Sequence, residues 1–318
     1  MAVCRMSDIN YRHTPVLLEE AVRALAIVPD GIYVDATFGR GSHSAAILQQ
    51  LNANGRLIAF DKDPDAVTFA KATIKDSRFQ IFHCSFIRMQ IVLQELDVFH
   101  KVRGILFDLG VSSPQLDDPT RGFSFVREGK LDMRMDSSQG TTAMTWLADV
   151  DEKKLATVLW EYGEEKFSRR IARAIVKARQ NAPIKTTTQL AEIIKFAMPK
   201  PKKPHDKHPA TRSFQAIRIA INQELTELEQ GLAQGLEVLA MGGRMAVISF
   251  HSLEDRIVKL FNKLHEQGET LPRGLPIKGE HFKARLKSIG KPIKPTLEEV
   301  DHNPRARSAI LRIVEKLS

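Results

Sequence analysis

The stretch Val34-Asp35-Ala36-Thr37-Phe38-Gly39-Arg40-Gly41-Ser42-His43-Ser44 decides the fold. An apolar run at 31–34 leads into it, and a helical pattern at 44–51 follows it. This order predicts a strand, a glycine turn and a helix. Glycines at positions 39 and 41 allow the backbone to pass close to a ligand that a side chain would keep away.

A second predicted strand, 55–60, ends directly before Asp61. An acidic residue at the tip of the second strand is placed to accept hydrogen bonds from a ribose diol. The series therefore favours a nucleoside-containing cofactor. An ordinary turn between a strand and a helix, with a surface aspartate, is the alternative at this point.

Predicted strands continue to alternate with helices, at 78–83 and 102–109. This rhythm is typical of a parallel sheet wound on both faces, an α/β fold in which ligands bind beyond the carboxyl ends of the strands. The unusual residues gather at such ends; they are Asp35, Gly39, Gly41, Asp61, Phe86 and Asp108.

The α/β rhythm then breaks. Helical patterns cover 145–161, 164–180 and 186–198, and a long helix at 210–240, closed by Gly242-Gly243, leads to a strand at 244–250. Further strands are expected at 308–314 and around 283–290. We therefore predict a discontinuous α/β domain, 1–115 and 208–318, with an inserted helical domain at 116–207.

Composition limits the class of protein. The 318 residues are 43% hydrophobic, which supports a sizeable core, but no apolar run is long enough to cross a bilayer. The amino-terminal stretch has no signal-peptide core, and the two cysteines, Cys4 and Cys84, suit a reducing compartment. We expect a cytoplasmic protein without a membrane partner. We expect no metal either, because His205, His208 and His251 form no helical pair and no cysteine accompanies them.

Basic charge is concentrated in one segment. The chain carries a net +9, and between Lys166 and Lys207 twelve basic residues face only Glu192 and Asp206. A concentrated basic face indicates a phosphate backbone as partner. A solvated helix face is the alternative.

Three features separate the possible cofactors. Ser44 breaks the continuation to a dinucleotide glycine motif, and no phosphate-binding P-loop occurs. The strand that ends in Asp108 runs into Ser112-Ser113-Pro114. A short polar element followed by proline at this point is common in S-adenosylmethionine-dependent enzymes that methylate exocyclic amines.

Long motifs in one order cover nearly the whole chain, and with them the chain resembles the ribosomal RNA small subunit methyltransferase H family. The motifs are 13–18 (HTPVLL), 35–41 (DATFGRG), 61–64 (DKDP), 108–115 (DLGVSSPQ), 121–125 (RGFSF), 131–136 (LDMRMD), 208–212 (HPATR), 249–256 (SFHSLEDR) and 303–308 (NPRARS). The resemblance implies a Rossmann-like class I methyltransferase fold with an inserted helical domain. It also implies methyl transfer from S-adenosylmethionine to the exocyclic N4 of a decoding-region cytidine in 16S rRNA of the small ribosomal subunit. A DNA amino-methyltransferase and a non-catalytic RNA-binding assembly factor are the alternatives, and a homodimer is common in such families.

The resemblance also implies site residues. The expected cofactor-binding residues are Gly39, Gly41, Ser42, His43, Asp61, Phe86, Asp108 and Gln115. We expect Asp108, Ser113 and the Pro114 carbonyl to accept hydrogen bonds from the target amine, and His251 to face the base or take the released proton. The expected RNA-binding residues are Arg134, Arg212, Arg256, Arg305, Arg307, Lys202 and Lys203, although Arg256 could instead pair with Glu254 or Asp255.

The chain departs from the family at Ser42, where glycine is usual. A serine is tolerated there if φ is negative, whereas a positive φ would cost about 1 kcal/mol.

The lysine-rich run yields a first prediction. Replacing Lys195, Lys200, Lys202 and Lys203 by glutamine should weaken RNA binding and flatten its salt dependence, because fewer counterions are released on binding. Binding measured at several salt concentrations checks this. An unchanged salt slope would mean that the lysines form only a solvated face.

Overall fold

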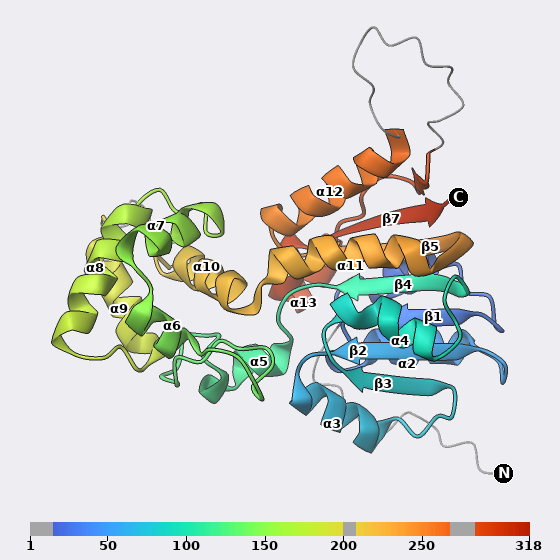
Figure 1. The fold of residues 1–318 in the computed structure, drawn as a ribbon, viewed down its shortest axis with the longest axis horizontal. Coiled ribbons are helices and arrows are strands. Elements are labelled where there is room, and N and C mark those ends of the chain that lie inside the picture. The colour runs from blue at the N-terminus through green and yellow to red at the C-terminus, as the bar shows by residue number, and fades with distance from the viewer. Residues whose placement is uncertain (1–14, 200–207, 268–283) are drawn as a thin grey trace, which may run out of the picture.

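The computed structural model describes residues 15–199, 208–267 and 284–318. A seven-stranded sheet in the order β3-β2-β1-β4-β5-β7-β6 forms its centre (Figure 1). All neighbouring strands are parallel except β7, which runs antiparallel to both β5 and β6. The strands are β1 (Ile32–Asp35), β2 (Arg56–Asp61), β3 (Phe79–His83), β4 (Val102–Asp108), β5 (Leu239–Ser249), β6 (Leu286–Ser288) and β7 (Ile310–Lys316). The structure thus confirms the doubly wound sheet and its closing antiparallel pair.

Helices cover both faces of the sheet, which explains why its strands are almost continuously apolar. Alternate residues of one strand face opposite cores: Leu106 packs with α1 and α2, whereas Ile105 and Phe107 pack with α4 and α11. The helices on the first face are α1 (Leu18–Ala24), α2 (Ser42–Gln50) and α3 (Pro64–Thr73), and those on the second are α4 (Met89–Glu95), α11 (Glu224–Val238) and α12 (Ser252–Gln267). The short helix α5 (Ser113–Asp117) follows β4 in the chain. The short helix α13 (Leu297–His302) precedes β7. None of the helices in the described ranges is long and apolar enough to cross a membrane.

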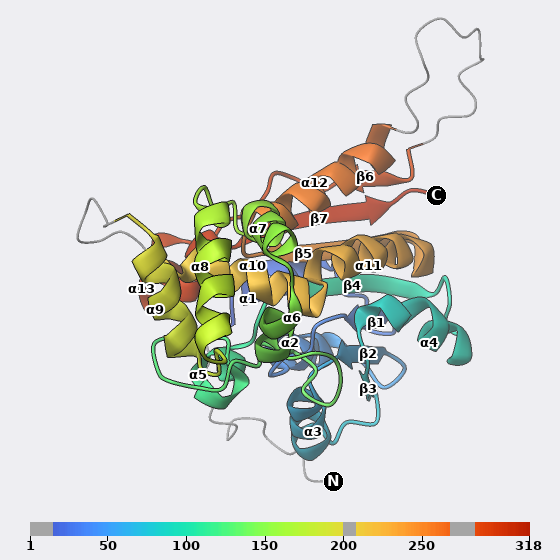
Figure 2. The same cartoon turned by 60° about the vertical axis from the view of Figure 1, so that its left-hand side comes forward.

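Five of the helices between β4 and β5, α6 to α10, form a second core. They lie beyond the ends toward which β1 to β4 point (Figures 1 and 2). Their bounds are α6 (Ala143–Asp149), α7 (Glu152–Glu161), α8 (Ser168–Asn181), α9 (Thr187–Ala197) and α10 (Thr211–Asn222). Phe214 and Ile217 place α10 in this second core rather than against the sheet. The domain boundary at residue 208 stays a prediction. Because α10 packs in the second core, the chain rejoins the α/β domain after Gln223, where α11 begins.

Two expected helices are each divided in the structure. The 145–161 pattern contains α6 and α7, because the Asp151 side chain accepts a hydrogen bond from Lys154 N and starts a new helix. The 210–240 pattern contains α10 and α11, and Gln223 between them adopts a left-handed φ of 52°. The expected end at Gly242-Gly243 was wrong, since α11 ends at Val238 and β5 begins at Leu239, which pairs with Val102.

Asn222 ties the α10–α11 junction to the loop before α6. It is 7% exposed. Its amide donates to Met133 O at 2.7 Å and Arg218 O at 2.9 Å, and its oxygen accepts from Met135 N at 2.7 Å. The side chain therefore satisfies backbone groups on both segments.

Asn222→Ala should lower the free energy of unfolding by about 2–3 kcal/mol, because buried backbone groups lose their partner. Urea denaturation measures the change. Asn54→Ala, on an exposed turn, is the control and should stay within about 0.5 kcal/mol of the wild type. Equal stability of the two variants would contradict this role of Asn222.

Candidate active site

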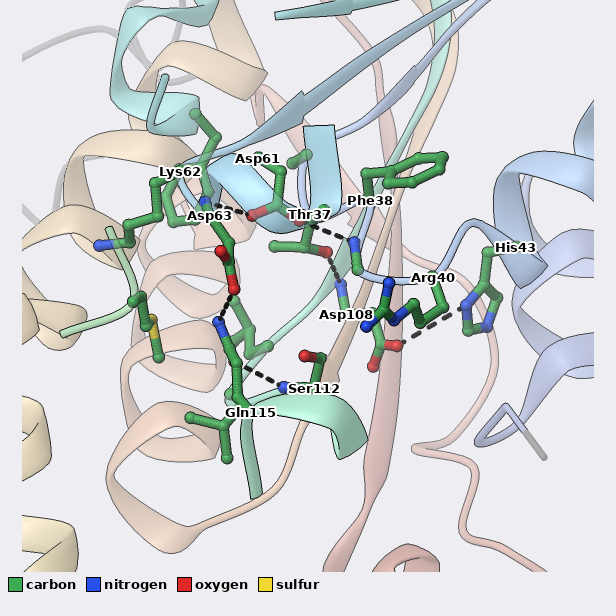
Figure 3. A pocket seen from close by; sticks show the side chains of 18 of the residues that line it. Thr37, Phe38, Arg40, His43, Asp61, Lys62, Asp63, Asp108, Ser112 and Gln115 are labelled. Atoms are coloured by element: carbon green, nitrogen blue, oxygen red, sulfur yellow. Dashed lines mark hydrogen bonds and ion pairs between the residues drawn. The ribbon is translucent and has the colours of Figure 1, made fainter. Parts of the chain in front are cut away.

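A cavity opens at the carboxyl ends of β1, β2 and β4, where the strand order reverses (Figure 3). Ligands bind at this switch point in doubly wound sheets. Ten of the predicted site residues line the cavity: Gly39, Gly41, Ser42, His43, Asp61, Phe86, Asp108, Ser113, Gln115 and Arg305.

The glycine turn between β1 and α2 is built around Asp35, which is 1% exposed. Its carboxylate accepts from Ser44 Oγ at 2.6 Å and from Thr37 N at 3.1 Å, although burial raises its pKa to about 6. Gly41 takes the left-handed conformation, with φ 74°, and a Cβ there would lie 2.5 Å from the Phe38 ring.

Ser42 is the first residue of α2, and its φ is not positive. The strain expected for a positive φ at this departure from the family therefore does not arise. The left-handed conformation falls on Gly41 instead.

Thr37 joins the ends of β1 and β4, since its hydroxyl accepts from Asp108 N at 2.7 Å. This bond places Asp108 beside the glycine turn, where its Oδ2 lies 3.6 Å from His43 Nδ1. Two predicted residues from segments far apart in sequence, His43 on α2 and Asp108 at the end of β4, thus face one cavity.

Asp61 ends β2, and backbone donors hold both of its carboxylate oxygens. Gly39 N donates to Oδ2 at 2.7 Å, and Asp63 N donates to Oδ1 at 2.8 Å. Burial raises the pKa of Asp61 to about 6 despite these bonds. Each oxygen can accept a further hydrogen bond, so the orientation suits a ribose diol.

Phe86 forms an apolar wall of the cavity. It is 9% exposed and meets Phe107 edge to face, with ring centroids 5.3 Å apart. A Cβ at Gly231 on α11 would lie 2.5 Å from the Phe86 ring, so the glycine makes room for it. Gly231 was not predicted as a site residue, although the Gly231–Gly235 spacing of one helical turn signals a helix closely approached by a neighbour.

Asp108 is the electrostatically unusual member of the site. Among the described residues, its buried Oδ1 has no hydrogen-bond partner. Burial, together with the nearby carboxylates of Asp35 and Glu254, raises its pKa to about 8. The carboxyl group can therefore accept a donor brought by a ligand, and can hold a proton near neutral pH.

Ser113 and Gln115 lie on α5, which a capping box between Ser112 and Gln115 begins. Both side chains are buried against the cavity. The Pro114 carbonyl accepts from Asp118 N at 3.0 Å within α5. Of the three predicted acceptors for the target amine, Asp108 and Ser113 line the cavity, whereas Pro114 is not among the lining residues.

His251 lies beside the cavity and contacts Glu254, with Nε2 3.1 Å from Oε1. Burial raises the pKa of Glu254, yet contacts with His251 and Arg218 hold it below its usual range. Glu224, His251 and Glu254 offer ligand atoms within 4.8 Å of one another. Arg218, however, already pairs with Glu224 at 2.8 Å. Its guanidinium therefore supplies a positive charge at the place where a metal ion would bind.

The predicted RNA-binding arginines do not form one cluster. Arg305 lines the cavity and pairs with Asp117 at 2.6 Å, and Arg134 pairs with Asp132 at 2.8 Å. Arg212 and Arg256 both contact Glu164, so neither Glu254 nor Asp255 is the partner of Arg256. Arg307 is exposed. Lys202 and Lys203 lie outside the described residues.

Sequence reasoning also missed a charged group on the wall between β2 and α11. Glu227 accepts from Lys62 Nζ at 2.7 Å and from Ser85 Oγ at 2.9 Å, and all three residues line the cavity. No motif signals this contact, since it joins residues more than a hundred positions apart.

The strand order, the closing antiparallel pair and the cavity at the switch point define a Rossmann-like methyltransferase fold. The model of the MraW methylase family matches residues 10–317. The chain belongs to this family.

One curated relative agrees with this assignment. The chain is 57% identical over 307 residues to Ribosomal RNA small subunit methyltransferase H of Pseudoalteromonas atlantica, covering 96% of this chain and 98% of the relative. Among solved structures, it is similar to an rRNA methylase from Streptococcus thermophilus (TM-score 0.40, 13% identity, 95% of this chain and 94% of that one). A SAM-dependent O-methyltransferase from Thermotoga maritima gives a TM-score of 0.42 at 10% identity, over 97% of this chain and 69% of that one. The family confirms the predicted methyltransferase class, with S-adenosylmethionine as methyl donor.

The raised pKa of Asp108 predicts a pH effect on stability. Between 3.8, its ordinary pKa, and about 8, the folded protein holds this proton more tightly than the unfolded chain. The contribution of Asp108 to stability is therefore fully present below this window and falls as the pH rises through it. Asp108→Asn, which stays neutral, should gain thermal stability relative to the cofactor-free wild type as the pH rises from 5 to 9.

Thermal unfolding at a series of pH values measures the difference. Asp97→Asn, which removes a fully exposed carboxylate, is the control and should give a flat difference. A flat difference for Asp108→Asn as well would contradict the raised pKa.

Proposed function

We propose that the chain transfers a methyl group from S-adenosylmethionine to the exocyclic N4 of a specific cytidine in the decoding region of 16S rRNA, within the small ribosomal subunit. The observation that carries the proposal is the buried Oδ1 of Asp108, which has no hydrogen-bond partner in the described part of the chain and faces the same cavity as Asp61 and Ser113. Membership of the MraW methylase family and the name of the Pseudoalteromonas relative support it.

The cavity divides into parts that suit the cofactor. Asp61 would accept the ribose hydroxyls, Phe86 would flank the adenine, and the turn at Gly41 to His43 would take the methionine end. Gln115, held on α5, would complete this set. The bound cofactor supplies an electrophilic methyl group on a sulfonium.

The target amine is a poor nucleophile, because its lone pair is delocalised into the pyrimidine ring. Acceptors at Asp108 and Ser113 would take hydrogen bonds from the amine hydrogens and favour a pyramidal nitrogen. As the new N–C bond forms and the C–S bond breaks, the nitrogen must lose a proton. A carboxyl group with a pKa near 8 is suited to take it.

His251 fits this role less well, since its ring lies against Glu254. In this proposal His251 faces the base or takes the released proton only in support of Asp108.

The inserted helices supply a surface for the RNA. The outer face of α8 and the turn before it expose five cations at helical spacing: Lys166, Arg169, Arg170, Arg173 and Lys177. A stripe of this kind suits phosphate contacts. An assembled small subunit as substrate, a cytoplasmic location and a homodimer belong to the same proposal.

Methyl transfer from labelled cofactor tests this function. Purified small subunits isolated from cells lacking the chain should accept one methyl group per particle, and mass mapping should place it on a cytidine N4. Methylation of duplex DNA instead would favour a DNA amino-methyltransferase, and no transfer to any substrate would favour a non-catalytic assembly factor.

Asp61→Ala should weaken S-adenosylmethionine binding at least about tenfold, because hydrogen bonds to a charged group contribute roughly 1.5–3 kcal/mol each. Isothermal titration calorimetry measures the affinity. Asp30→Ala, at an exposed position, is the matched control. An affinity unchanged by Asp61→Ala would remove Asp61 from the cofactor site.

A further inference from the structure

Asp63 lies between the cofactor turn and the loops on the other side of the cavity, and it is 4% exposed. Its backbone N–H donates to Asp61 Oδ1 at 2.8 Å. Its Oδ1 accepts from Asp65 N at 3.0 Å, which starts α3. The residue is thus fixed to the strand end that carries Asp61.

The second oxygen, Oδ2, accepts from Gln115 Nε2 at 2.7 Å (Figure 3). Because an ionised carboxylate only accepts hydrogen bonds, this contact sets which end of the Gln115 amide faces it. The opposite end, Oε1, then accepts from Ser112 N at 2.9 Å and completes the capping box of α5. The orientation of Gln115 therefore determines how the helix carrying Ser113 begins.

The same oxygen accepts from Arg121 Nη1 at 2.8 Å. The other nitrogen of this guanidinium, Nη2, donates to Arg134 O at 3.2 Å and Met135 O at 2.9 Å. Met135 lines the cavity. One carboxylate thus holds two separate walls of the site, one through an amide and one through a guanidinium.

We propose that Asp63 is a positioning residue that couples the cofactor-binding turn to the Ser113 helix and to the Arg134–Met135 loop. The inference rests on the proposed function for its catalytic consequence, but the coupling itself is a property of the free protein. Asp63 acts through Asp61, Gln115 and Arg121.

Asp63→Asn separates this role from general folding. An amide offers one oxygen and one donor group where the carboxylate offers two oxygens. The variant therefore loses one acceptor, either the one for Asp65 N at the start of α3 or the one for Gln115 and Arg121. Rotating the Gln115 amide to compensate would point its N–H groups at Ser112 N, which is itself a donor. The backbone N–H that holds Asp61 is kept.

Asp65→Asn is the matched control. Asp65 also pairs with Arg121, at 3.2 Å, but its side chain is 69% exposed and it contacts neither Gln115 nor Asp61. The Asp65→Asn variant therefore removes the same charge two residues further along the chain.

Three measurements are made on the full chain. In Asp63→Asn, amide hydrogen exchange across 112–117 and 131–136 should be at least about tenfold faster than in the wild type, since the hydrogen bonds lost are to a charged group. The single-turnover rate constant at saturating S-adenosylmethionine should fall at least about tenfold by the same reasoning. The affinity for S-adenosylmethionine should fall less than it does in Asp61→Ala, with unchanged stoichiometry, because Asp61 keeps its donors although Gln115 loses one contact. Asp65→Asn should leave all three unchanged.

Exchange at wild-type rates, or a rate constant within about threefold of wild type, would overturn the proposal. So would a loss of binding stoichiometry in proportion to activity, which would make Asp63 a folding residue only. If the wild type methylates no substrate while the exchange still responds to Asp63→Asn, the proposed function fails and the coupling stands.

Discussion

The cost of burying carboxylates at the end of a parallel sheet governs this site. Asp35, Asp61 and Asp108 end neighbouring strands, and burial raises the pKa of each. Asp35 is satisfied by Ser44 and Thr37, and Asp61 by two backbone donors. Asp108 alone among the three keeps a buried oxygen without a hydrogen-bond partner in the described structure. Groups of the protein thus donate hydrogen bonds to two of the carboxylates, whereas the third can accept one from a bound ligand.

The surroundings of these carboxylates are tied together by short contacts between distant segments. Thr37 fixes β1 to β4, and Asp63 fixes β2 to α5 and to the loop near Met135. Asn222 fixes the same loop to the junction of α10 and α11. The cavity is consequently framed by both cores, and the sheet contributes the strand-end carboxylates Asp61 and Asp108 to its lining.

Much of the fold followed from patterns that depend only on local sequence. The strand–turn–helix at 34–44, the alternation up to Asp108 and the helical segment between β4 and β5 were all predictable, because apolar periodicity and glycine placement are local signals. The division of two helices was not predictable. Asp151 divides one of them as a helix cap and Gln223 divides the other through its left-handed φ, and apolar periodicity reveals neither.

The site was predictable in the same measure. Residues at strand ends, such as Asp61 and Asp108, were found because topology alone brings them together. Asp63, Glu227 and Gly231 were missed as site residues, because their roles depend on contacts with residues that only the folded chain brings near. The partner of Arg256 was missed for that reason too, because Arg256 pairs with Glu164 on a distant segment rather than with a neighbour in sequence.

The place where the helical segment leaves and rejoins the sheet decides how a change in that segment can reach the site. The chain leaves after β4 and returns to β5, its immediate parallel neighbour, and α11 alone covers the sheet on the way back. No strand pairing therefore depends on α6 to α10. A change within these helices therefore leaves the pairing of β4 with β5 in place, but it reaches the strand ends through contacts such as that of the Asn222 side chain with Met135 N.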